Sequence, residues 1–437
     1  MPGTDTPNHY VTIDERLCNG CVLCMKACPT KAIRVKEGRT ASIQGVCIYC
    51  GECVRVCPRN AVKAVTSGED VQSLTRNATI IVSPVIYTQY GDEVMPNEIL
   101  LAVHSSFTYV YDLGYTNELY NLATEMYIQK NHTKKGAPWP LISPACPVIN
   151  RIISYRFPSL LKNLLPIITP RELAAKFLRE RLPSRGRIPD REPLPSEGRL
   201  PSEEVSRTDP KVIYSLTPCP AEIISIREPI LLNDSFLDGV LGINELYGIV
   251  NRNIRKGEEH ILLHRSGGIG MGWGFSGGEI SGLNTGKYLA VSGIQESIRY
   301  LEKIEMGLFN GLDYVELRAC SEGCVGGPMT VADRYQAKRT IQKLVRMFGI
   351  EKRTRYSEIQ KAYEEGWFFS DIKRVLGADC EKPLTFSEAL QKQEQIGKIL
   401  EMLPGKECGV CGSPDCQTFA EDVVEGRTTL EHCVFLK

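Results

Sequence analysis

Two stretches near the start of the chain carry the same cysteine pattern: residues 18–29 read CNGCVLCMKACP, and residues 47–58 read CIYCGECVRVCP. Each stretch spaces four cysteines as C-x-x-C-x-x-C-x-x-x-C, and a proline follows the fourth cysteine directly. The second copy starts 29 residues after the first, so the segment is an internal repeat. Three thiolates on such a tight loop can cover three corners of a cubane cluster, and the fourth corner needs a ligand from elsewhere.

This spacing is typical of bacterial two-cluster ferredoxins, in which the fourth cysteine of each run binds the other cluster. We therefore expect a ferredoxin-like α+β domain over residues 1–72, with two 4Fe-4S clusters that pass electrons. The alternative is zinc, which prefers two separated Cys-x-x-Cys pairs. The predicted ligands are Cys18, Cys21, Cys24 and Cys57 (the Cys18 set) for one cluster, and Cys47, Cys50, Cys53 and Cys28 (the Cys47 set) for the other.

The composition of the whole chain fits a globular protein of about two to four domains. Its 437 residues are 42% hydrophobic and 24% charged, which excludes a collagen, a coiled coil and a wholly disordered chain. Lys+Arg and Asp+Glu each total 52, so no polybasic field is present to bind nucleic acid. No stretch reaches the roughly 18 apolar residues of a membrane helix, and no secretory signal is evident. We therefore expect a cytoplasmic protein whose clustered cysteines, among 17 in all, bind metal rather than form disulfides.

Between residues 73 and 350, strand-like and helix-like stretches alternate, which favours an α/β domain. The strand-like runs are Thr79–Val85, Val212–Leu216 and Tyr314–Leu317. The predicted helices are Asn97–Ser105, Tyr115–Lys130, Gln295–Met306 and Ala332–Met347. Residues 181–209 are rich in proline, serine and charge and repeat an LPS motif, so we expect a mobile insertion there.

Four further cysteines of this domain lie in three separate segments, each near a strand end or a turn rich in glycine or proline. Cys146 lies in SPACP, Cys219 in TPCPAE, and Cys320 and Cys324 in ELRACSEGCVGGP. Glycines in the last segment let the backbone approach a bulky group closely. These four thiols (the Cys146 set) could bind one more cluster. The alternative is that they are buried small side chains without a ligand.

The three segments resemble the signature segments of the FeFe-hydrogenase catalytic domain: T-S-C-C-P, M-P-C-x-x-K and E-x-M-A-C-x-x-G-C-x-G-G. They occur in the same order, after a ferredoxin repeat, and the resemblance covers residues 1 to about 350. It implies two lobes of twisted parallel sheet with helices outside and an H-cluster in the cleft between them. An H-cluster is a 4Fe-4S cubane linked through one cysteine to a diiron unit that carries CO, cyanide and an amine dithiolate. The implied cubane ligands are Cys146, Cys219, Cys320 and Cys324, and the implied bridging thiolate is Cys324.

The chain departs from the family pattern beside this cluster. Ala145 stands where the family has the cysteine that hands protons to the diiron amine, and alanine has no proton to give. Glu222 replaces a lysine that donates to cyanide, and Thr217 and Arg318 replace two methionines. A general acid–base group contributes about 10²–10⁴-fold to a rate, so we expect slow turnover unless Glu125 or Glu222 carries protons instead. Glu125 resembles in position a relay glutamate of prototypical members; the alternative is a solvated helix face.

A last cysteine group follows a predicted helix, Ser387–Leu403, within a helical C-terminal region over residues 351–437. Its spacing resembles the single 4Fe-4S module of corrinoid-protein partners and of an Rnf-type electron-transport subunit. The resemblance implies a third 4Fe-4S cluster that exchanges electrons with a partner; a zinc site is the alternative. The predicted ligands are Cys408, Cys411, Cys416 and Cys433 (the Cys408 set).

The resemblance therefore implies an FeFe-hydrogenase-like oxidoreductase, similar to the divergent, sensory (group D-like) branch, with three 4Fe-4S clusters and an H-cluster. It would interconvert H2 with protons and electrons slowly and sense H2 in an anaerobe. Its expected partner is a redox protein, either a ferredoxin or a signalling or electron-transfer subunit, and self-association into a homo-oligomer stays open. The alternative is an electron-transfer or scaffold subunit that carries 4Fe-4S clusters and no diiron site.

Overall fold

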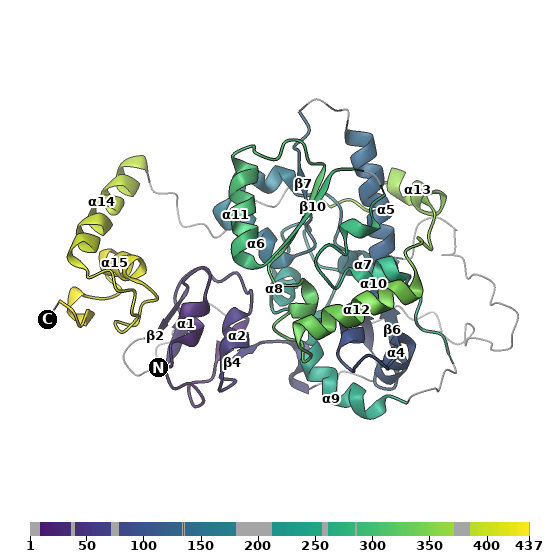
Figure 1. Cartoon of the computed structure of the whole chain (residues 1–437), viewed down its shortest axis with the longest axis horizontal. Coiled ribbons are helices and arrows are strands. Elements are labelled where there is room, and N and C mark those ends of the chain that lie inside the picture. The colour runs from purple at the N-terminus through teal and green to yellow at the C-terminus, as the bar shows by residue number, and fades with distance from the viewer. Residues whose placement is uncertain are drawn as a thin grey trace, which may run out of the picture. The chain divides into compact units, whose positions relative to one another are not determined.

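The computed structural model describes residues 9–35, 40–70, 78–132, 134, 136–180, 212–255, 261–284, 286–370 and 385–436. The chain divides into two compact units (Figure 1). The cysteine-rich unit is Met1–Val65 together with Leu376–Lys437, and the central unit is Thr66–Val375. The predicted insertion at 181–209 lies outside the described residues. No helix in the described ranges is long and apolar enough to cross a membrane.

The N-terminal half of the cysteine-rich unit consists of short elements around the two cysteine runs. Two antiparallel strand pairs, β1 with β4 and β2 with β3, accompany two five-residue helices. The residue before each helix is left-handed: Gly51 in the second copy, and Val22, with φ of 61°, at the matching place in the first. The elements are β1 (Val11–Ile13), α1 (Leu23–Ala27), β2 (Ile33–Val35), β3 (Ala41–Ile43), α2 (Glu52–Val56) and β4 (Val62–Ala64). The predicted ferredoxin-like α+β fold of this part is confirmed.

The C-terminal half of the same unit is a small helical module. Helix α14 (Phe386–Met402) begins at a capping box, in which the Thr385 and Glu388 side chains satisfy each other's backbone N–H groups. Helix α15 (Cys416–Val424) is capped by Asp415, and a 3-10 turn, η8 (Leu430–His432), follows. The helices enclose a core of Ile396, Leu403, Phe419, Ala420 and Cys433.

The central unit contains two parallel sheets, as expected for an α/β domain. One has the strand order β6-β5-β8-β9 and the other β10-β11-β7, and every pairing in both is parallel. The strands are β5 (Ala78–Val82), β6 (Tyr109–Asp112), β7 (Leu141–Ile142), β8 (Val212–Thr217), β9 (Gly239–Gly242), β10 (Tyr288–Ser292) and β11 (Tyr314–Arg318). All five residues of β5 are buried, as the unbroken apolar run predicts for a strand covered on both faces.

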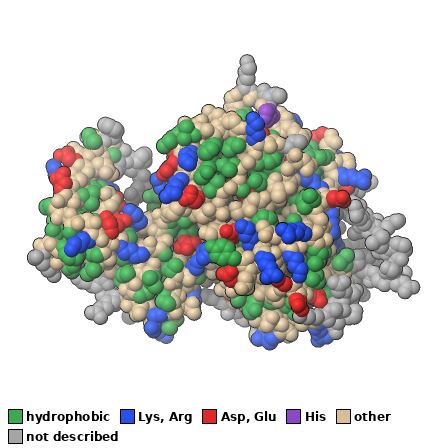
Figure 2. Space-filling model, in the orientation of Figure 1, with side chains coloured by type: hydrophobic (Ala, Val, Ile, Leu, Met, Phe, Trp, Pro, Cys, Tyr) green, Lys and Arg blue, Asp and Glu red, His purple; other side chains and the backbone are tan. Residues whose placement is uncertain are grey.

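Helices flank these sheets. The four helices that the sequence predicts here are α4, α5, α11 and α12, and each begins and ends within two residues of its expected bounds. The helices are α4 (Pro96–His104), α5 (Leu113–Asn131), α6 (Pro147–Arg156), α7 (Pro170–Glu180), α8 (Ala221–Arg227), α9 (Ile243–Asn253), α10 (Gly268–Gly272), α11 (Ile294–Glu305), α12 (Arg334–Phe348) and α13 (Tyr356–Glu364). Lys and Arg side chains gather along the exposed side of α12 (Figure 2).

The observed units differ from the predicted domain boundaries in two places. The first segment of the cysteine-rich unit ends at Val65 rather than at residue 72, and the central unit continues past α13 to Val375 rather than ending at residue 350. Ile359 of α13 and Phe368 beyond it are buried in one apolar cluster with Leu119 of α5, which explains the second difference. The C-terminal cysteine module belongs to the same compact unit as the ferredoxin-like part.

Candidate metal centres

The Cys18 set lines a single pocket of the cysteine-rich unit. Three cysteines of the first run therefore meet the last cysteine of the second run, in the crossed pattern that the repeat predicts. Two backbone N–H groups point at the sulfurs: that of Ala41 at Cys18 Sγ (3.4 Å) and that of Ala61 at Cys57 Sγ (3.3 Å). Such N–H groups would stabilise negative charge on thiolates that bind iron.

The Cys47 set also converges. Burial raises the pKa of Cys53 to about 12, and the neighbouring thiols of Cys47 and Cys28 act in the same direction. Burial likewise raises the pKa of Cys50 well above its ordinary value, and Cys53 and Cys28 are again among the neighbours. The thiols of Cys50 and Cys53 are therefore protonated in the metal-free chain, and iron binding must release their protons.

The Cys408 set lines a pocket of its own at the other end of the chain. Two glycines on either side of Cys411 adopt left-handed backbone conformations: Gly409 with φ of 78° and Gly412 with φ of 85°. A side chain would be strained at both positions, so the loop can turn tightly around its ligand. Cys416 opens helix α15, and its N–H donates to Glu407 Oε2 (2.8 Å).

The Cys146 set assembles where strands of both sheets in the central unit end. Cys146 caps α6 soon after β7, Cys219 follows β8, and Cys320 and Cys324 follow β11. Ligand sites in parallel sheets lie beyond the carboxyl ends of the strands, which is where these cysteines stand. The three other thiols of the set are electrostatic neighbours of the Cys219 thiol. The donor set of four thiols matches that of a cubane cluster.

Charged side chains, among them the Arg318 cation, lie close to the buried thiols of the Cys146 set. Burial raises the pKa of Cys219 well above its ordinary value and that of Cys324 to about 11. The guanidinium of Arg318 opposes this effect at Cys324. Within the described ranges, no three His, Cys, Asp or Glu side chains are arranged to hold a single metal ion.

Two of the positions that depart from the family pattern, Ala145 and Glu222, are linked through a third residue, Arg171. Ala145 is buried, and its carbonyl accepts a hydrogen bond from Arg171 Nη1 (3.4 Å). The Nε of the same guanidinium lies 3.6 Å from Glu222 Oε1, which also accepts from Ser215 Oγ (2.5 Å). Glu222 is among the charges that act on Cys324, so the structure places it close to the Cys146 set. The signature segments do not contain Arg171, and sequence reasoning missed it.

Glu125 is held in a different environment. Its carboxylate is 2.8 Å from Lys352 Nζ and accepts hydrogen bonds from the Tyr356 hydroxyl and the Asn284 N–H. Only 1% of its surface is exposed, so the alternative of a solvated helix face is wrong. The partners come from a loop (Asn284), from the segment that leads into α13 (Lys352) and from the first residue of α13 (Tyr356).

Sequence reasoning also missed Glu279, which lies at the centre of a buried network. Its carboxylate accepts from Ser143 Oγ (2.8 Å), from the Tyr314 hydroxyl and from Arg318 Nη2 (2.8 Å). Burial raises the pKa of Glu279 to about 7, although Arg318 acts in the opposite direction. Ser143 in turn accepts from the Ala145 N–H (3.2 Å), so the network reaches the first cysteine segment. The one local signal was the glycine-dense stretch 267–278 that ends directly before Glu279.

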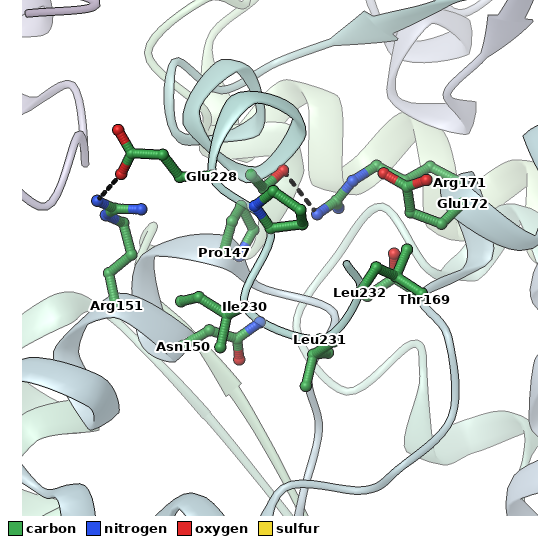
Figure 3. A pocket seen from close by; sticks show the side chains of 12 residues that line it. Pro147, Asn150, Arg151, Thr169, Arg171, Glu172, Glu228, Ile230, Leu231 and Leu232 are labelled. Carbon is green, nitrogen blue, oxygen red and sulfur yellow. Dashed lines mark hydrogen bonds and ion pairs between the residues drawn. The ribbon is translucent and has the colours of Figure 1, made fainter. Parts of the chain in front are cut away.

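A pocket opens beside Cys146, between α6, α7 and the segment after α8 (Figure 3). Arg151 and Glu228 form an ion pair on one side (3.1 Å), and Arg171 projects from the other. Two buried polar atoms of the lining, Asn150 Oδ1 and Thr169 Oγ1, have no hydrogen-bond partner among the described residues. Buried polar atoms of this kind are usually satisfied by ordered water, so the pocket is suited to hold water next to the cysteine segment.

Comparisons with known proteins agree with the motifs. Residues 76–191 match the family model for the C-terminal domain of the iron-only hydrogenase large subunit. Residues 10–58 match the model for a 4Fe-4S dicluster domain, and residues 403–435 match that of an Fe-S cluster module. No curated protein sequence matches the chain. The resemblance to FeFe-hydrogenases that the cysteine segments indicate is thereby confirmed.

Solved structures give the same answer for the fold. The chain is similar to the FeFe-hydrogenase HydA(deltaEFG), with a TM-score of 0.50 and 14% identity over 68% of this chain and 93% of that one. It is also similar to a glutamate-to-alanine variant of the FeFe-hydrogenase HydA1 from Chlamydomonas reinhardtii, with a TM-score of 0.49 and 14% identity over 66% of this chain and 89% of that one. At this identity the likeness to HydA(deltaEFG) shows a shared fold and nothing finer.

Proposed function

We propose that this FeFe-hydrogenase-like iron-sulfur protein interconverts H2 with protons and electrons at an H-cluster, slowly, and that it serves an anaerobe as a cytoplasmic H2 sensor. The observation that carries the proposal is the convergence of the Cys146 set from the ends of strands in both sheets. These cysteines would hold the cubane, with Cys324 as the bridging thiolate. When bound, the H-cluster supplies the H2 chemistry, and the chain supplies ligands, an apolar surrounding and an electron route.

The electron route would consist of three 4Fe-4S clusters in the Cys18, Cys47 and Cys408 sets. Each set provides four thiols, and two of the sets line pockets of their own. Two-cluster ferredoxin modules pass electrons rather than make or break bonds. A ferredoxin or a signalling or electron-transfer subunit would give or take the electrons at the end of this route.

Slow turnover follows from the groups around the Cys146 set. Ala145 has no proton to give where a relay cysteine is expected, and its side chain is buried. The proposed substitutes are Glu222, which is held by Ser215 and Arg171, and Glu125, which is held by Lys352. A carboxylate fixed by an ion pair must leave its partner before it can carry a proton, which favours a sensor over a fast enzyme.

One observation favours the alternative of an electron-transfer or scaffold subunit without a diiron site. Arg318 stands where the resemblance implies a methionine, and its guanidinium is fixed between Glu316 (3.1 Å) and Glu279 (2.8 Å) while acting on Cys324. This guanidinium is already engaged by two buried carboxylates, so the surroundings of the proposed bridging thiolate differ from the methionine environment that the resemblance implies.

Infrared spectroscopy separates the two functions. The full chain would be matured anaerobically with the diiron precursor and exposed to H2 and then to argon. We expect CO and cyanide bands that shift under H2 and that are lost in Cys324→Ser. Absence of those bands, with cubane signals intact in electron paramagnetic resonance (EPR), would establish the cluster-only subunit instead.

A further inference from the structure

A buried ion pair joins the two halves of the cysteine-rich unit. Arg34 of β2 contacts Asp422 of α15 through two hydrogen bonds, Nε to Oδ2 (2.5 Å) and Nη2 to Oδ1 (3.1 Å). The side chains are 3% and 0% exposed. Asp422 also accepts from Ser413 Oγ (2.9 Å) and from Arg427 Nη1 (3.2 Å). Two charges withdrawn from water are tolerated only when their geometry is well satisfied, so this pair selects one arrangement of the two halves.

The cysteine loops themselves are hydrogen-bonded across the same contact. Lys26 lies between Cys24 and Cys28, and its Nζ donates to the carbonyls of Glu407 (2.5 Å) and Pro414 (2.6 Å). These two residues belong to the loop that carries Cys408, Cys411 and Cys416. A second ion pair, Lys31 with Asp415 (2.6 Å), lies beside this contact.

Two residues show which N-terminal site adjoins the C-terminal one. Val35 lines the pocket of the Cys18 set, and its N–H donates to the carbonyl of Gly412 (2.9 Å), the residue after Cys411. Gly409 lines the pocket of the Cys408 set, and a Cβ built on it would lie 3.1 Å from the Cε of the fully buried Met25. The lining of the Cys18 pocket is therefore hydrogen-bonded to the residue next to Cys411, and the side chains of Met25 and Lys26 contact the lining of the Cys408 pocket.

We propose that the Cys408 set and the Cys18 set form a direct electron relay inside this unit, and that Arg34 and Asp422 are its positioning residues. A reduced 4Fe-4S cluster in the Cys408 set would transfer one electron to an oxidised cluster in the Cys18 set, and the reverse step is the same process run backwards. No bond forms or breaks and no proton moves. The electron comes from a one-electron donor, either a reduced ferredoxin-type protein or dithionite in the test. The inference rests on the proposed function only in that these cysteines hold clusters.

EPR of the full chain, anaerobically reconstituted and reduced with dithionite, tests the relay. We expect the wild-type spectrum to contain a spin–spin interaction that involves the C-terminal cluster. Arg34→Met should lose that part of the interaction and show an additional isolated, slowly relaxing cluster signal at unchanged iron content. Lys398→Met, which removes a cation from an exposed pair on α14, is the matched control and should leave the spectrum unchanged.

Hydrogen exchange gives a second measure that does not depend on spins. Because removing one partner of a buried ion pair is strongly destabilising, the amide of Val35 should exchange on the order of 100-fold faster in Arg34→Met. If Arg34→Met fails to fold, Asp422→Asn replaces it. This substitution keeps the size of the side chain and the hydrogen bond from Ser413, so it should show the same changes to a smaller extent.

Wild-type protein with all cluster signals but no interaction from the C-terminal cluster would overturn the relay. So would Arg34→Met with the wild-type spectrum and unchanged exchange at Val35. If the infrared test of the proposed function finds no CO and cyanide bands, the relay proposal still holds, because it does not depend on the diiron unit. A missing signal from the C-terminal cluster would overturn both the relay and the assignment of the Cys408 set as ligands.

Discussion

Arg171 Nε lies 3.6 Å from Glu222 Oε1, next to the carbonyl that Ala145 presents to the same guanidinium. The resemblance implies a lysine at position 222, whereas this chain has a carboxylate there that faces the Arg171 cation of α7. A cation near the Cys146 set is thus supplied by Arg171, a residue outside the signature segments. We expect positions 171 and 222 to be coupled, because a lysine at position 222 would face the Arg171 guanidinium.

The first prediction concerns this coupling. Glu222→Lys should lower the free energy of unfolding of the iron-free chain by about 3 kcal/mol, since it sets two cations side by side in a largely buried place. Adding Arg171→Gln should recover most of the loss. Urea unfolding followed by circular dichroism measures both. The control is Glu228→Gln, which breaks the more exposed pair with Arg151 and should cost less than about 1 kcal/mol. Additive effects of the two changes would show that the residues are not coupled.

The second prediction restores the missing proton donor. Ala145→Cys adds one thiol at a buried position whose backbone N–H and carbonyl are already fixed by Ser143 and Arg171. If the diiron unit is installed, H2 evolution from a reduced viologen should rise by about 10²–10⁴-fold, the usual contribution of a general acid. The control is Ala145→Ser, whose hydroxyl is a far weaker acid and should give little increase. Equal rates in all three proteins, with the infrared bands present, would mean that protons already reach the site by another route.

The third prediction follows from the raised pKa of Glu279. A carboxyl whose pKa is ordinarily 4.5 and about 7 in the folded chain holds its proton more tightly when folded. Its contribution to stability is therefore complete below about pH 4.5 and is lost as the pH rises through 7. Between pH 4.5 and 7.5 the free energy of unfolding of the wild type should fall, and in Glu279→Gln this fall should be smaller by up to about 3 kcal/mol.

This pH effect is measured by unfolding the iron-free chain in urea at several pH values and following the signal of the central unit. Glu358→Gln, on the exposed part of α13, is the control and should keep the wild-type slope. A Glu279→Gln protein with the wild-type slope would show that Arg318 keeps the carboxyl charged throughout.

The fourth prediction concerns iron removal. The N-terminal half of the cysteine-rich unit has helices of five residues and strands of three, too short to be stable without their ligands. Anaerobic chelation should therefore expose the amides of β1 to β4 to rapid exchange while those of β5 and β8 stay protected. Mass spectrometry of deuterated peptides measures both sets in one sample. Equal loss of protection in both units would mean that the clusters stabilise the whole chain.

Sequence reasoning succeeded where the information is local. The ferredoxin-like part, the α/β character of the central unit and five helices were predicted, because cysteine spacing and periodicity lie within short stretches. It failed where partners are distant in sequence. Glu279 lies 136 residues from Ser143 and 39 from Arg318, and no local pattern distinguishes it from a solvated glutamate. Arg34 and Asp422 are 388 residues apart, and each is an ordinary charged residue in its own segment.

That separation of 388 residues also sets an order of events during synthesis. A ribosome adds about 5–20 residues per second, so Arg34 emerges roughly 20–80 s before Asp422 exists. During this interval the face of the ferredoxin-like half that later receives the C-terminal module is open to solvent. Proteins that deliver iron and sulfide can reach the Cys18 set from that side before the last fifty residues close it.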